Sequence, residues 1–412
     1  MGAATLHERI ASSDCQSDSA GNPVAGGSLS LSEPLVIDDR LWARVMDLTG
    51  GAAAVCFQCG VCTAACPWGL VRNETLPVRS LMRQAQLGLE SGGTDAWLCT
   101  TCRQCEAYCP RGVRIGDVMR GLRYLDWEER RTPPGLATLL WSLHGNNNPW
   151  NQPPSTRAVW ARDLAIPRFD ADQHEILLYV GCTAAYDRRV QDVTRALASV
   201  LRAAGISFGT LGDDEPCCGE SALNLGHKPF FDELIGEAAD RFEQNAVSRL
   251  ITVSPHCYDS FKNHLPVGTD ELEVMHYVQY LARLVAEDRL SFDAGPVGRI
   301  VFHDPCYLAR HHGDAHSARN VLGALPGIDL VEMEQHGPDT LCCGGGGGRM
   351  WLETAADERF ADIRIGQAVD VQAQILCTAC PFCLVCLEDS AKALKVKNLR
   401  VLDLVEILSQ AL

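Results

Sequence analysis

The feature that most constrains this chain is a cysteine spacing that occurs twice in its N-terminal third. The blocks read CFQCGVCTAACP and CTTCRQCEAYCP, and each has the form C-x2-C-x2-C-x3-C-P. The spacing is typical of paired 4Fe-4S cubanes, in which three thiolates of one block bind one cluster and the fourth binds the other. It is not a zinc-finger spacing, so zinc sites and unliganded thiols are the weaker alternatives. The eight predicted ligands are Cys56, Cys59, Cys62, Cys66, Cys99, Cys102, Cys105 and Cys109.

The number of cysteines also indicates where the chain functions. There are 20 in 412 residues, and their grouping favours metal ligation in a reducing compartment over a secreted disulfide framework. The sequence shows neither a secretory signal nor an apolar run long enough to cross a bilayer. We expect a cytoplasmic protein with no transmembrane segment of its own, or one held peripherally at the inner face of the cell membrane by another subunit.

Charge narrows the class of partner. The formal net charge is −16, which disfavours binding to nucleic acid or to an anionic membrane surface because both are negatively charged. A basic protein partner fits this charge better.

The region around the two blocks is predicted to be helical. Apolar residues recur at helical spacing between the blocks and again in GVRIGDVMRGLRYLDWEER. We assign residues 36–135 to a ferredoxin-type domain with two 4Fe-4S clusters. Residues 1–35 are predicted to be a mobile tail with Cys15 as a spare thiol. Residues 136–175, which include LATLLWSL (a buried helix or a docking face) and the Pro- and Asn-rich HGNNNPWNQPPSTRAVW, are predicted to be a linker, without regular structure in its Pro- and Asn-rich part.

Beyond residue 175 the pattern changes to strands alternating with helices. EILLYVGC and RLITVSPHC predict buried strands that run into cysteines, and VTRALASVLRAAG predicts an amphipathic helix between them. This alternation indicates an α/β unit, in which functional residues usually lie at the carboxyl ends of the strands.

The α/β unit occurs twice. GCTAAY aligns with DPCYLA, the two CCG triplets align, and SPHC aligns with CPFC, at offsets of 124, 125 and 126 residues. A tandem duplication explains this regularity. We therefore predict two domains, residues 176–292 and 293–412. The expected fold is α+β and multidomain, with a helical two-cluster ferredoxin domain followed by two tandem α/β cysteine-rich CCG domains.

These motifs resemble a known family. The repeats C-x34-C-C-G-x34-S-P-H-C and C-x35-C-C-G-x35-C-P-F-C resemble the paired CCG domains of heterodisulfide reductase, and WLCTTCRQCEAYCPRGV looks like its ferredoxin-type subunit. FHDPCYLARHHG and CCGGGGGRMWLE are similar to related iron–sulfur oxidoreductases that take electrons from electron-transfer flavoprotein toward quinone. The resemblance implies a non-cubane 4Fe-4S centre on five thiolates at each complete CCG site, with disulfide cleavage where two such centres meet.

By position, the resemblance implies a complete second site and an incomplete first one. Ser254 stands where the second repeat has Cys380. Four thiolates still suffice for an ordinary cubane at the first site, and a zinc ion or no metal are the alternatives. Its ligands would be Cys182, Cys217, Cys218 and Cys257. The second site would hold one non-cubane 4Fe-4S cluster and be catalytic, through Cys306, Cys342, Cys343, Cys380 and Cys383.

Other residues near the second site receive further assignments. His303 and Asp304 are expected to be hydrogen-bond donors or proton carriers beside the site, or else a helix-capping pair. The glycines 344–348 are expected to let the backbone approach a cluster and donate N–H bonds to sulfur. Cys377 and Cys386 are expected to be small buried residues or alternative ligands. Three histidines are predicted to lie at the surface or in loops: His256, His311 and His312.

The expected function is that of an iron–sulfur oxidoreductase subunit that passes electrons through two cubanes to the second CCG centre, with heterodisulfide reductase-like thiol/disulfide chemistry. The alternative is a non-catalytic conduit from electron-transfer flavoprotein to a membrane quinone-reducing partner. Both roles need redox protein partners, such as a flavoprotein or ferredoxin-like donor. The sequence does not select among a disulfide, a thiol and a quinone as terminal substrate.

Overall fold

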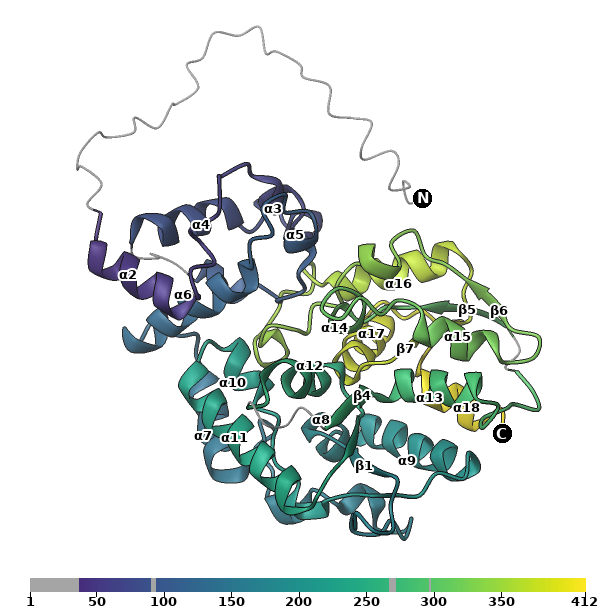
Figure 1. The fold of residues 1–412 in the computed structure, drawn as a ribbon. Coiled ribbons are helices and arrows are strands. Elements are labelled where there is room, and N and C mark those ends of the chain that lie inside the picture. The colour runs from purple at the N-terminus through teal and green to yellow at the C-terminus, as the bar shows by residue number, and fades with distance from the viewer. Residues whose placement is uncertain (1–36, 90–93, 267–271, 296–297) are drawn as a thin grey trace, which may run out of the picture. The chain divides into compact units, whose positions relative to one another are not determined.

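The computed structural model describes residues 37–89, 94–266, 272–295 and 298–412. Residues 38–412 belong to one unit, drawn as a coloured ribbon in Figure 1. The tail predicted for residues 1–35, with Cys15, lies outside the described residues. Within the described ranges, no helix is long and apolar enough to cross a membrane.

Short helices make up the ferredoxin domain, as the spacing of its apolar residues predicts. The first begins after Asp38, whose carboxylate accepts hydrogen bonds from the backbone N–H groups of Arg40 and Leu41. Trp68 and Met82 are buried in the core that these helices enclose. The elements are α2 (Asp39–Leu48), α3 (Val61–Ala64), η1 (Pro67–Leu70), α4 (Val78–Leu87), η2 (Asp95–Leu98), α5 (Gln104–Ala107) and α6 (Ile115–Glu128).

The structure differs from the linker expected in residues 136–175. The side-chain amide of Asn148 donates to the backbone carbonyls of Asn146 and Gln152 at 2.8 and 2.7 Å, and Asn148 is fully buried. Its polar side chain therefore stabilises a folded turn, because short polar side chains readily hydrogen-bond to nearby backbone. The regular elements in this segment are α7 (Leu136–Asn146), η3 (Pro154–Thr156) and η4 (Val159–Ala161).

The first cysteine-rich domain is built on a four-stranded parallel sheet with strand order β2-β1-β3-β4. The inner strand β1 is apolar throughout and fully buried, as expected for a strand that is covered on both faces of the sheet. The strands are β1 (Ile176–Tyr179), β2 (Phe208–Gly209), β3 (Arg249–Thr252) and β4 (Glu273–His276). The helices are α8 (Cys182–Tyr186), α9 (Arg188–Ala203), η5 (Gly212–Asp214), α10 (Glu220–Asn224), α11 (Lys228–Gln244), α12 (Pro255–His264) and α13 (Tyr277–Ala286).

The second cysteine-rich domain repeats this plan with strand order β6-β5-β7-β8, again all parallel. The identical order supports the duplication inferred from the sequence, and the predicted fold class is confirmed. The strands are β5 (Arg299–Phe302), β6 (Asp329–Val331), β7 (Ile375–Thr378) and β8 (Arg400–Asp403). The helices are α14 (Cys306–Ala309), α15 (Ser317–Gly323), η6 (Gly337–Asp339), η7 (Arg349–Trp351), α16 (Phe360–Asp370), α17 (Pro381–Ala393) and α18 (Leu404–Ser409).

The repeat extends to the caps of its last helices. In the first domain, the side chain of His276 caps α13, and Gln279 accepts a hydrogen bond from the backbone N–H of His276 at 3.1 Å. In the second, Asp403 caps α18 and Glu406 accepts from the backbone N–H of Asp403 at 2.8 Å. The hydroxyl of Tyr277 donates to Asp403 at 2.7 Å, so the two caps are joined across the domain boundary.

Candidate metal centres

The first group of ferredoxin-type cysteines combines both sequence blocks. Cys56, Cys59 and Cys62 from the first block line one small pocket together with Cys109, the fourth cysteine of the second block. The backbone N–H of Val113 donates to the Cys109 sulfur at 3.4 Å. The structure thus brings together three thiols of one block and the last of the other.

The second group is the complement of the first. Burial raises the pKa of Cys66, and the neighbouring thiols of Cys102 and Cys99 raise it further. The pKa of Cys105 is likewise raised by burial and by the nearness of Cys99, Cys102 and Cys66. Thiols packed this closely cannot all ionise unless a cation compensates their charge, which is the situation at a metal centre.

The first CCG site gathers the four cysteines expected there. The sulfurs of Cys182 and Cys217 are 3.6 Å apart, and Cys218 is hydrogen-bonded to both Cys217 and Cys257. The backbone N–H of Gly219 donates to the Cys217 sulfur at 3.5 Å. The site follows the carboxyl ends of β1 and β3, as predicted for a parallel sheet.

Two residues that the sequence analysis did not single out belong to this site. The guanidinium of Arg157, fully buried in the segment expected to be a linker, approaches the Cys182 sulfur at 3.5 Å. It also pairs with the buried carboxylate of Glu215 at 2.9 Å. Glu215 in turn accepts hydrogen bonds from the backbone N–H groups that precede Cys182. The sequence feature that could have pointed to these two residues is the position of Glu215, an acidic residue just before Pro-Cys-Cys.

Ser254 lies at the first site but serves as a helix cap. It precedes α12, and its hydroxyl accepts a hydrogen bond from the backbone N–H of His256 at 3.3 Å. Ser254 lines the same pocket as Cys182, Cys217 and Cys257. The hydroxyl therefore occupies the position that a fifth thiol would take.

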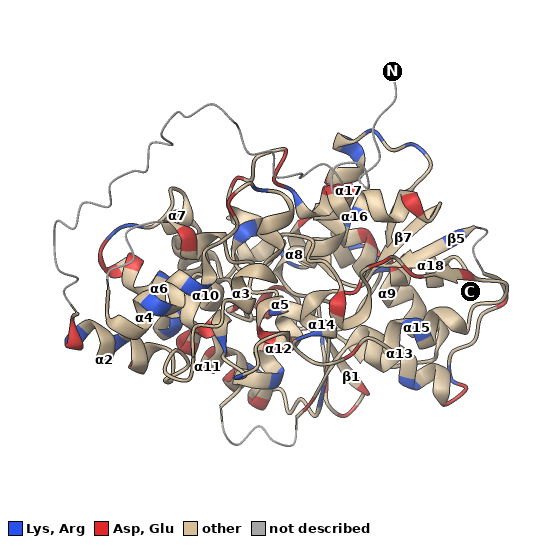
Figure 2. Ribbon diagram, turned by 90° about the horizontal axis from the view of Figure 1, so that it is seen from above, with Lys and Arg blue, Asp and Glu red and all other residues tan. Residues whose placement is uncertain are grey.

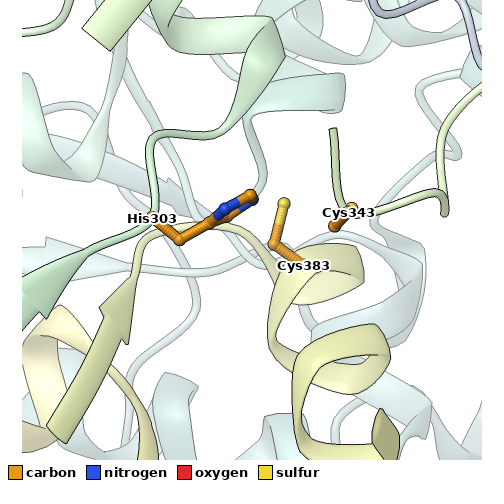
Figure 3. Close-up of side chains that lie close together, drawn as sticks. All are labelled: His303, Cys343 and Cys383. Carbon is orange, nitrogen blue, oxygen red and sulfur yellow. The ribbon is translucent and has the colours of Figure 1, made fainter. Parts of the chain in front are cut away.

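The second CCG site gathers all five expected cysteines. Interactions between neighbouring thiols link them in the order Cys306, Cys342, Cys343, Cys383 and Cys380. The backbone N–H of Gly344 donates to the Cys342 sulfur at 3.3 Å, in agreement with the role expected for the glycine loop. Figure 3 shows His303 beside two of these thiols, and ligand atoms of His303, Cys343 and Cys383 all lie within 4.8 Å of one another.

The orientation of His303 is fixed by Arg364. The Arg364 Nε–H donates to His303 Nδ1 at 3.1 Å, and a guanidinium cannot accept, so the imidazole proton resides on Nε2. Burial lowers the pKa of His303 well below its usual value, and Arg364 and Arg310 lower it further, so the ring is neutral. Its buried Nε2 has no hydrogen-bond partner among the described residues. This N–H is a donor available to the site.

Asp304 is not a helix cap. Its carboxylate pairs with Arg319 at 2.6 Å and accepts from the backbone N–H of Gly337 at 2.7 Å. Helix α14 begins after Pro305 without a side-chain cap. Asp304 is therefore a buried ion-pair residue that anchors the loop around Gly337.

The prediction that three histidines lie at the surface or in loops is wrong for His256, which lies in α12, whereas His311 and His312 do lie in a loop. His256 is buried, its Nδ1 is 2.6 Å from a carboxylate oxygen of Glu220, and it is hydrogen-bonded to the Cys380 thiol of the other CCG domain. The side chains of His311 and His312 are also nearly inaccessible and approach Asp259 at 3.6 and 3.0 Å. Packing between the two CCG domains buries all three side chains, which local sequence does not reveal.

The environment of Cys380 distinguishes it from the other thiols. Burial alone would raise its pKa, but hydrogen bonds from Cys383 and His256 lower it instead. His256 lies in the first turn of α12 in the first CCG domain, so one domain completes the surroundings of a cysteine in the other. Phe382 makes the converse contact, since it lines the pocket of the first site.

The second ferredoxin-type group lies directly against the second CCG site. Cys102 and Cys342 are hydrogen-bonded, and the Cys342 sulfur is 3.7 Å from the hydroxyl of Thr100. The glycine loop makes this approach possible. A Cβ at Gly346 would lie only 2.6 Å from the carbonyl oxygen of Thr100, which no real side chain tolerates.

Comparison with protein families agrees with this arrangement. A 4Fe-4S dicluster domain matches residues 52–113, and the cysteine-rich CCG domain matches residues 176–262 and 300–388. The chain therefore combines a 4Fe-4S dicluster domain with two CCG domains. This family resemblance was expected from the motifs and is confirmed.

Three curated relatives illustrate the similarity. A probable iron-sulfur-binding oxidoreductase of Bacillus subtilis is 35% identical over 77% of this chain and 46% of its own length. The EtfAB:quinone oxidoreductase of Syntrophomonas wolfei is 35% identical over 80% of this chain and 48% of its own length. One of the subunits of the dihydromethanophenazine:CoB–CoM heterodisulfide reductase of Methanosarcina barkeri is 28% identical over 87% of this chain and 93% of its own length. The chain thus spans about half the length of the first two relatives.

Proposed function

We propose that this iron–sulfur oxidoreductase passes electrons along its two ferredoxin-type centres to a catalytic centre at the second CCG site. The observation that carries the proposal is the contact between Cys102 and Cys342. It joins the second ferredoxin-type group to the second CCG group without an intervening residue. Electron transfer between redox centres requires such proximity, and the chain offers it at one end of the ferredoxin domain.

The thiol groups fit the clusters that this role requires. Two sets of four cysteines would hold cubanes: Cys56, Cys59, Cys62 and Cys109, and Cys66, Cys99, Cys102 and Cys105. The five thiols of the second CCG site would hold a non-cubane 4Fe-4S centre, and the four of the first site a further 4Fe-4S cluster or zinc. Bound clusters would supply one-electron transfer. The residues keep the sulfurs together, exclude water by burial and donate N–H bonds to sulfur.

The exposed end of the route is the group around Cys59. Cys59 is exposed, and the adjacent Phe57 has 58% of its surface accessible. Arg79 and Arg111 line the same pocket, and Figure 2 shows basic residues on α4 and α6 of this domain. We propose that a flavoprotein or ferredoxin-like donor docks here through an acidic rim. The basic local charge therefore favours an acidic partner, in contrast to the basic partner that the net charge of the whole chain favoured.

At the catalytic end, the residues suit cleavage of a disulfide. The Nε2–H of His303 is held in place by Arg364 and points to the region of Cys343 and Cys383. A fixed neutral donor can stabilise a thiolate as it leaves, because a hydrogen bond to a charged acceptor is stronger than one to a neutral acceptor. His303 is proposed to serve as this donor.

The second candidate is an electron conduit that breaks no bond. It is favoured by the incomplete first site, where the hydroxyl of Ser254 replaces a thiol, because paired five-thiolate centres are then unavailable. The EtfAB:quinone oxidoreductase of Syntrophomonas wolfei is as similar to this chain, at 35% identity, as the relative from Bacillus subtilis. In this role a membrane partner would reduce quinone, and the chain would sit at the inner face of the membrane.

Metal analysis and spectroscopy test the proposal. Anaerobically purified full-length protein should contain about 12 iron atoms per chain, or about 16 if the first CCG site is also filled. Thiols added to the oxidised protein should perturb one paramagnetic signal, whereas a conduit would show no such response and would pass electrons from a flavoprotein to a quinone analogue with its membrane partner. About 8 iron atoms with stoichiometric zinc would contradict a cluster at the CCG site.

A further inference from the structure

A cavity of about 650 Å³ opens beside the second CCG site. Its walls include Cys343, one of the five grouped thiols, and Cys386 from α17. Cavities that bind small molecules commonly measure roughly 300 to 1,000 Å³. The volume and the position suit a small molecule that must reach the site.

Cys386 is the accessible thiol of this cavity. It follows Cys383 by three residues on α17, so both side chains lie on the same face of the helix. Cys386 is partly exposed, whereas Cys377 is fully buried in β7 and donates to its neighbour's carbonyl. A Cβ at Gly345 would lie 2.9 Å from the Cys386 sulfur, so the glycine leaves room for this thiol.

A second polar group lines the same cavity without a partner. Ser390, one helical turn beyond Cys386, is 1% exposed, and its buried hydroxyl has no hydrogen-bond partner among the described residues. An unsatisfied buried hydroxyl is costly, and native proteins rarely retain one without a reason. A ligand in the cavity would supply the missing partner.

The cavity also contains a buried cation. Arg349 is 9% exposed and donates to the carbonyl of Glu353 and the hydroxyl of Thr354, and no carboxylate in the described part of the chain forms an ion pair with it. The nearby Glu358 is paired with Arg72 at 3.0 Å. Glu353, Glu358, Asp389 and Arg359 also line the cavity, and Glu358 acts on Arg349 at longer range, so the anionic part of a ligand would bind at Arg349 itself.

We propose that this cavity binds a small disulfide bearing a negatively charged group, and that Cys386 exchanges with it. Arg349 would bind the anionic group, Ser390 would donate a hydrogen bond to sulfur, and Cys386 would be the attacking thiol. This deepens the proposed function, which supplies the reductant. It also gives a single complete CCG site a way to handle both halves of a disulfide, because one half is held covalently by Cys386.

The step balances as follows. The Cys386 thiol loses its proton and attacks one sulfur of RSSR, a bond forms between Cys386 and one half, the original S–S bond breaks, and the other half leaves as RSH with that proton. Two electrons, supplied one at a time by the reduced iron–sulfur centres, and two protons then cleave the mixed disulfide into the Cys386 thiol and a second RSH. The sum is reduction of RSSR by two electrons and two protons to two RSH.

The test uses full-length, cluster-loaded protein under anaerobic conditions with two disulfide probes of opposite charge. Glutathione disulfide is anionic and cystamine is cationic. Peptide mass mapping should find one glutathionyl group on Cys386 and none on Cys377, and C386S should lose it while C377S keeps it. In R349Q, the rate of glutathione adduct formation should fall about tenfold, the effect of losing one hydrogen bond to a charged group, while the cystamine rate does not fall.

Two results would overturn the inference. One is wild-type protein without an adduct on Cys386, and the other is an equal fall in the rates for both probes in R349Q, which would make Arg349 merely structural. Reduction of the ferredoxin-type centres by dithionite, followed by electron paramagnetic resonance, separates this failure from failure of the proposed function. If those centres load and reduce normally while Cys386 stays unmodified, only the exchange proposal is lost.

Discussion

The two CCG domains share one strand order, yet their cysteine sites are not equivalent. Ser254 in the first domain takes the place of Cys380 in the second, and two residues further on His256 takes the place of Phe382. These two rings lie 4.6 Å apart across the domain boundary. Each faces the other domain's site, because His256 is hydrogen-bonded to Cys380 while Phe382 lines the pocket of Ser254.

The comparison teaches that the duplicated sites differ in facing pairs rather than at single positions. A hydrogen-bond donor, His256, meets the thiol of Cys380, whereas an apolar ring, Phe382, lines the same pocket as the hydroxyl of Ser254. A thiolate needs a donor or cation nearby when it is buried, but a capping hydroxyl does not. The fifth cysteine and the histidine opposite it therefore form one functional pair.

The largest expected difference is between two single variants, each of which removes the matching cysteine from one of the two CCG sites. Cys383→Ser should lower the iron content by about four atoms and abolish the thiol-induced signal, because it breaks the five-thiol group. Cys257→Ser should leave that signal and only slow turnover. Metal analysis and electron paramagnetic resonance on both variants provide the measurement. Equal loss of the thiol response in both variants would show that the two sites act as a matched pair.

A smaller effect should follow from exchanging the facing rings. His256→Phe together with Glu220→Gln removes the donor to Cys380 without leaving a buried carboxylate unpaired. The hydrogen bond from His256 favours the thiolate of Cys380, so its loss should raise the pKa of this thiol and slow its alkylation by iodoacetamide in cluster-free protein. Phe382→His is the matched control and should leave the alkylation rate of Cys380 unchanged. An unchanged rate in the double variant would separate the histidine from the fifth thiol.

The matching helix caps predict opposite pH dependence in the two domains. Burial lowers the pKa of His276 to about 3, so its stabilising effect is complete above the unfolded value of about 6.5 and is lost as the pH falls toward 3. Burial raises the pKa of Asp403 to about 8, so its effect is complete below about pH 4 and is lost as the pH rises toward 8.

Thermal denaturation between pH 5 and 9 measures these two effects. His276→Gln should flatten the acid side of the stability profile and Asp403→Asn the alkaline side, each by about 1.4 kcal/mol at most per unit of pH in the affected range. Each variant controls for the other. The two windows overlap below about pH 6.5, so the idea fails if His276→Gln alters the profile above pH 7 or if Asp403→Asn leaves the profile between pH 7 and 8 unchanged.

The smallest effect is expected from restoring the missing thiol. Ser254→Cys alone should change the signal of the first CCG site only slightly, because Phe382 offers no hydrogen bond to the new sulfur. Ser254→Cys with Phe382→His should change it more, since it recreates the pair found at the second site. The ferredoxin signals serve as an internal reference. A full change with Ser254→Cys alone would show that the facing ring is unimportant.

The sequence was sufficient to predict the fold because its signals are local. GVRIGDVMRGLRYLDWEER became α6, EILLYVGC became β1, and the two equivalent sheets follow from the repeat. The cysteine groups could also be anticipated, because the carboxyl ends of adjacent parallel strands must meet at one edge.

What could not be predicted depends on packing between domains. His256 was expected at the surface, but it is covered by Tyr307 and Phe382 of the other repeat, with ring centroids at 3.9 and 4.6 Å. Arg123 left a weak signal, since it lies at helical spacing from the buried Met119 and so occupies the apolar face of α6. Periodicity can indicate that such a residue lies inside, but not what it touches.

The surroundings of Arg123 bear on how the molecule unfolds. Its buried guanidinium donates to the carbonyls of Ala96 and Cys99 in the ferredoxin domain, of Asn224 in the first CCG domain and of Gly347 in the second. If any one domain separated, a buried cation would lose partners that water cannot replace while the others stay closed. The three domains are thus expected to melt in one cooperative transition. An excised ferredoxin domain is therefore expected to be less stable to unfolding than the same residues within the whole chain.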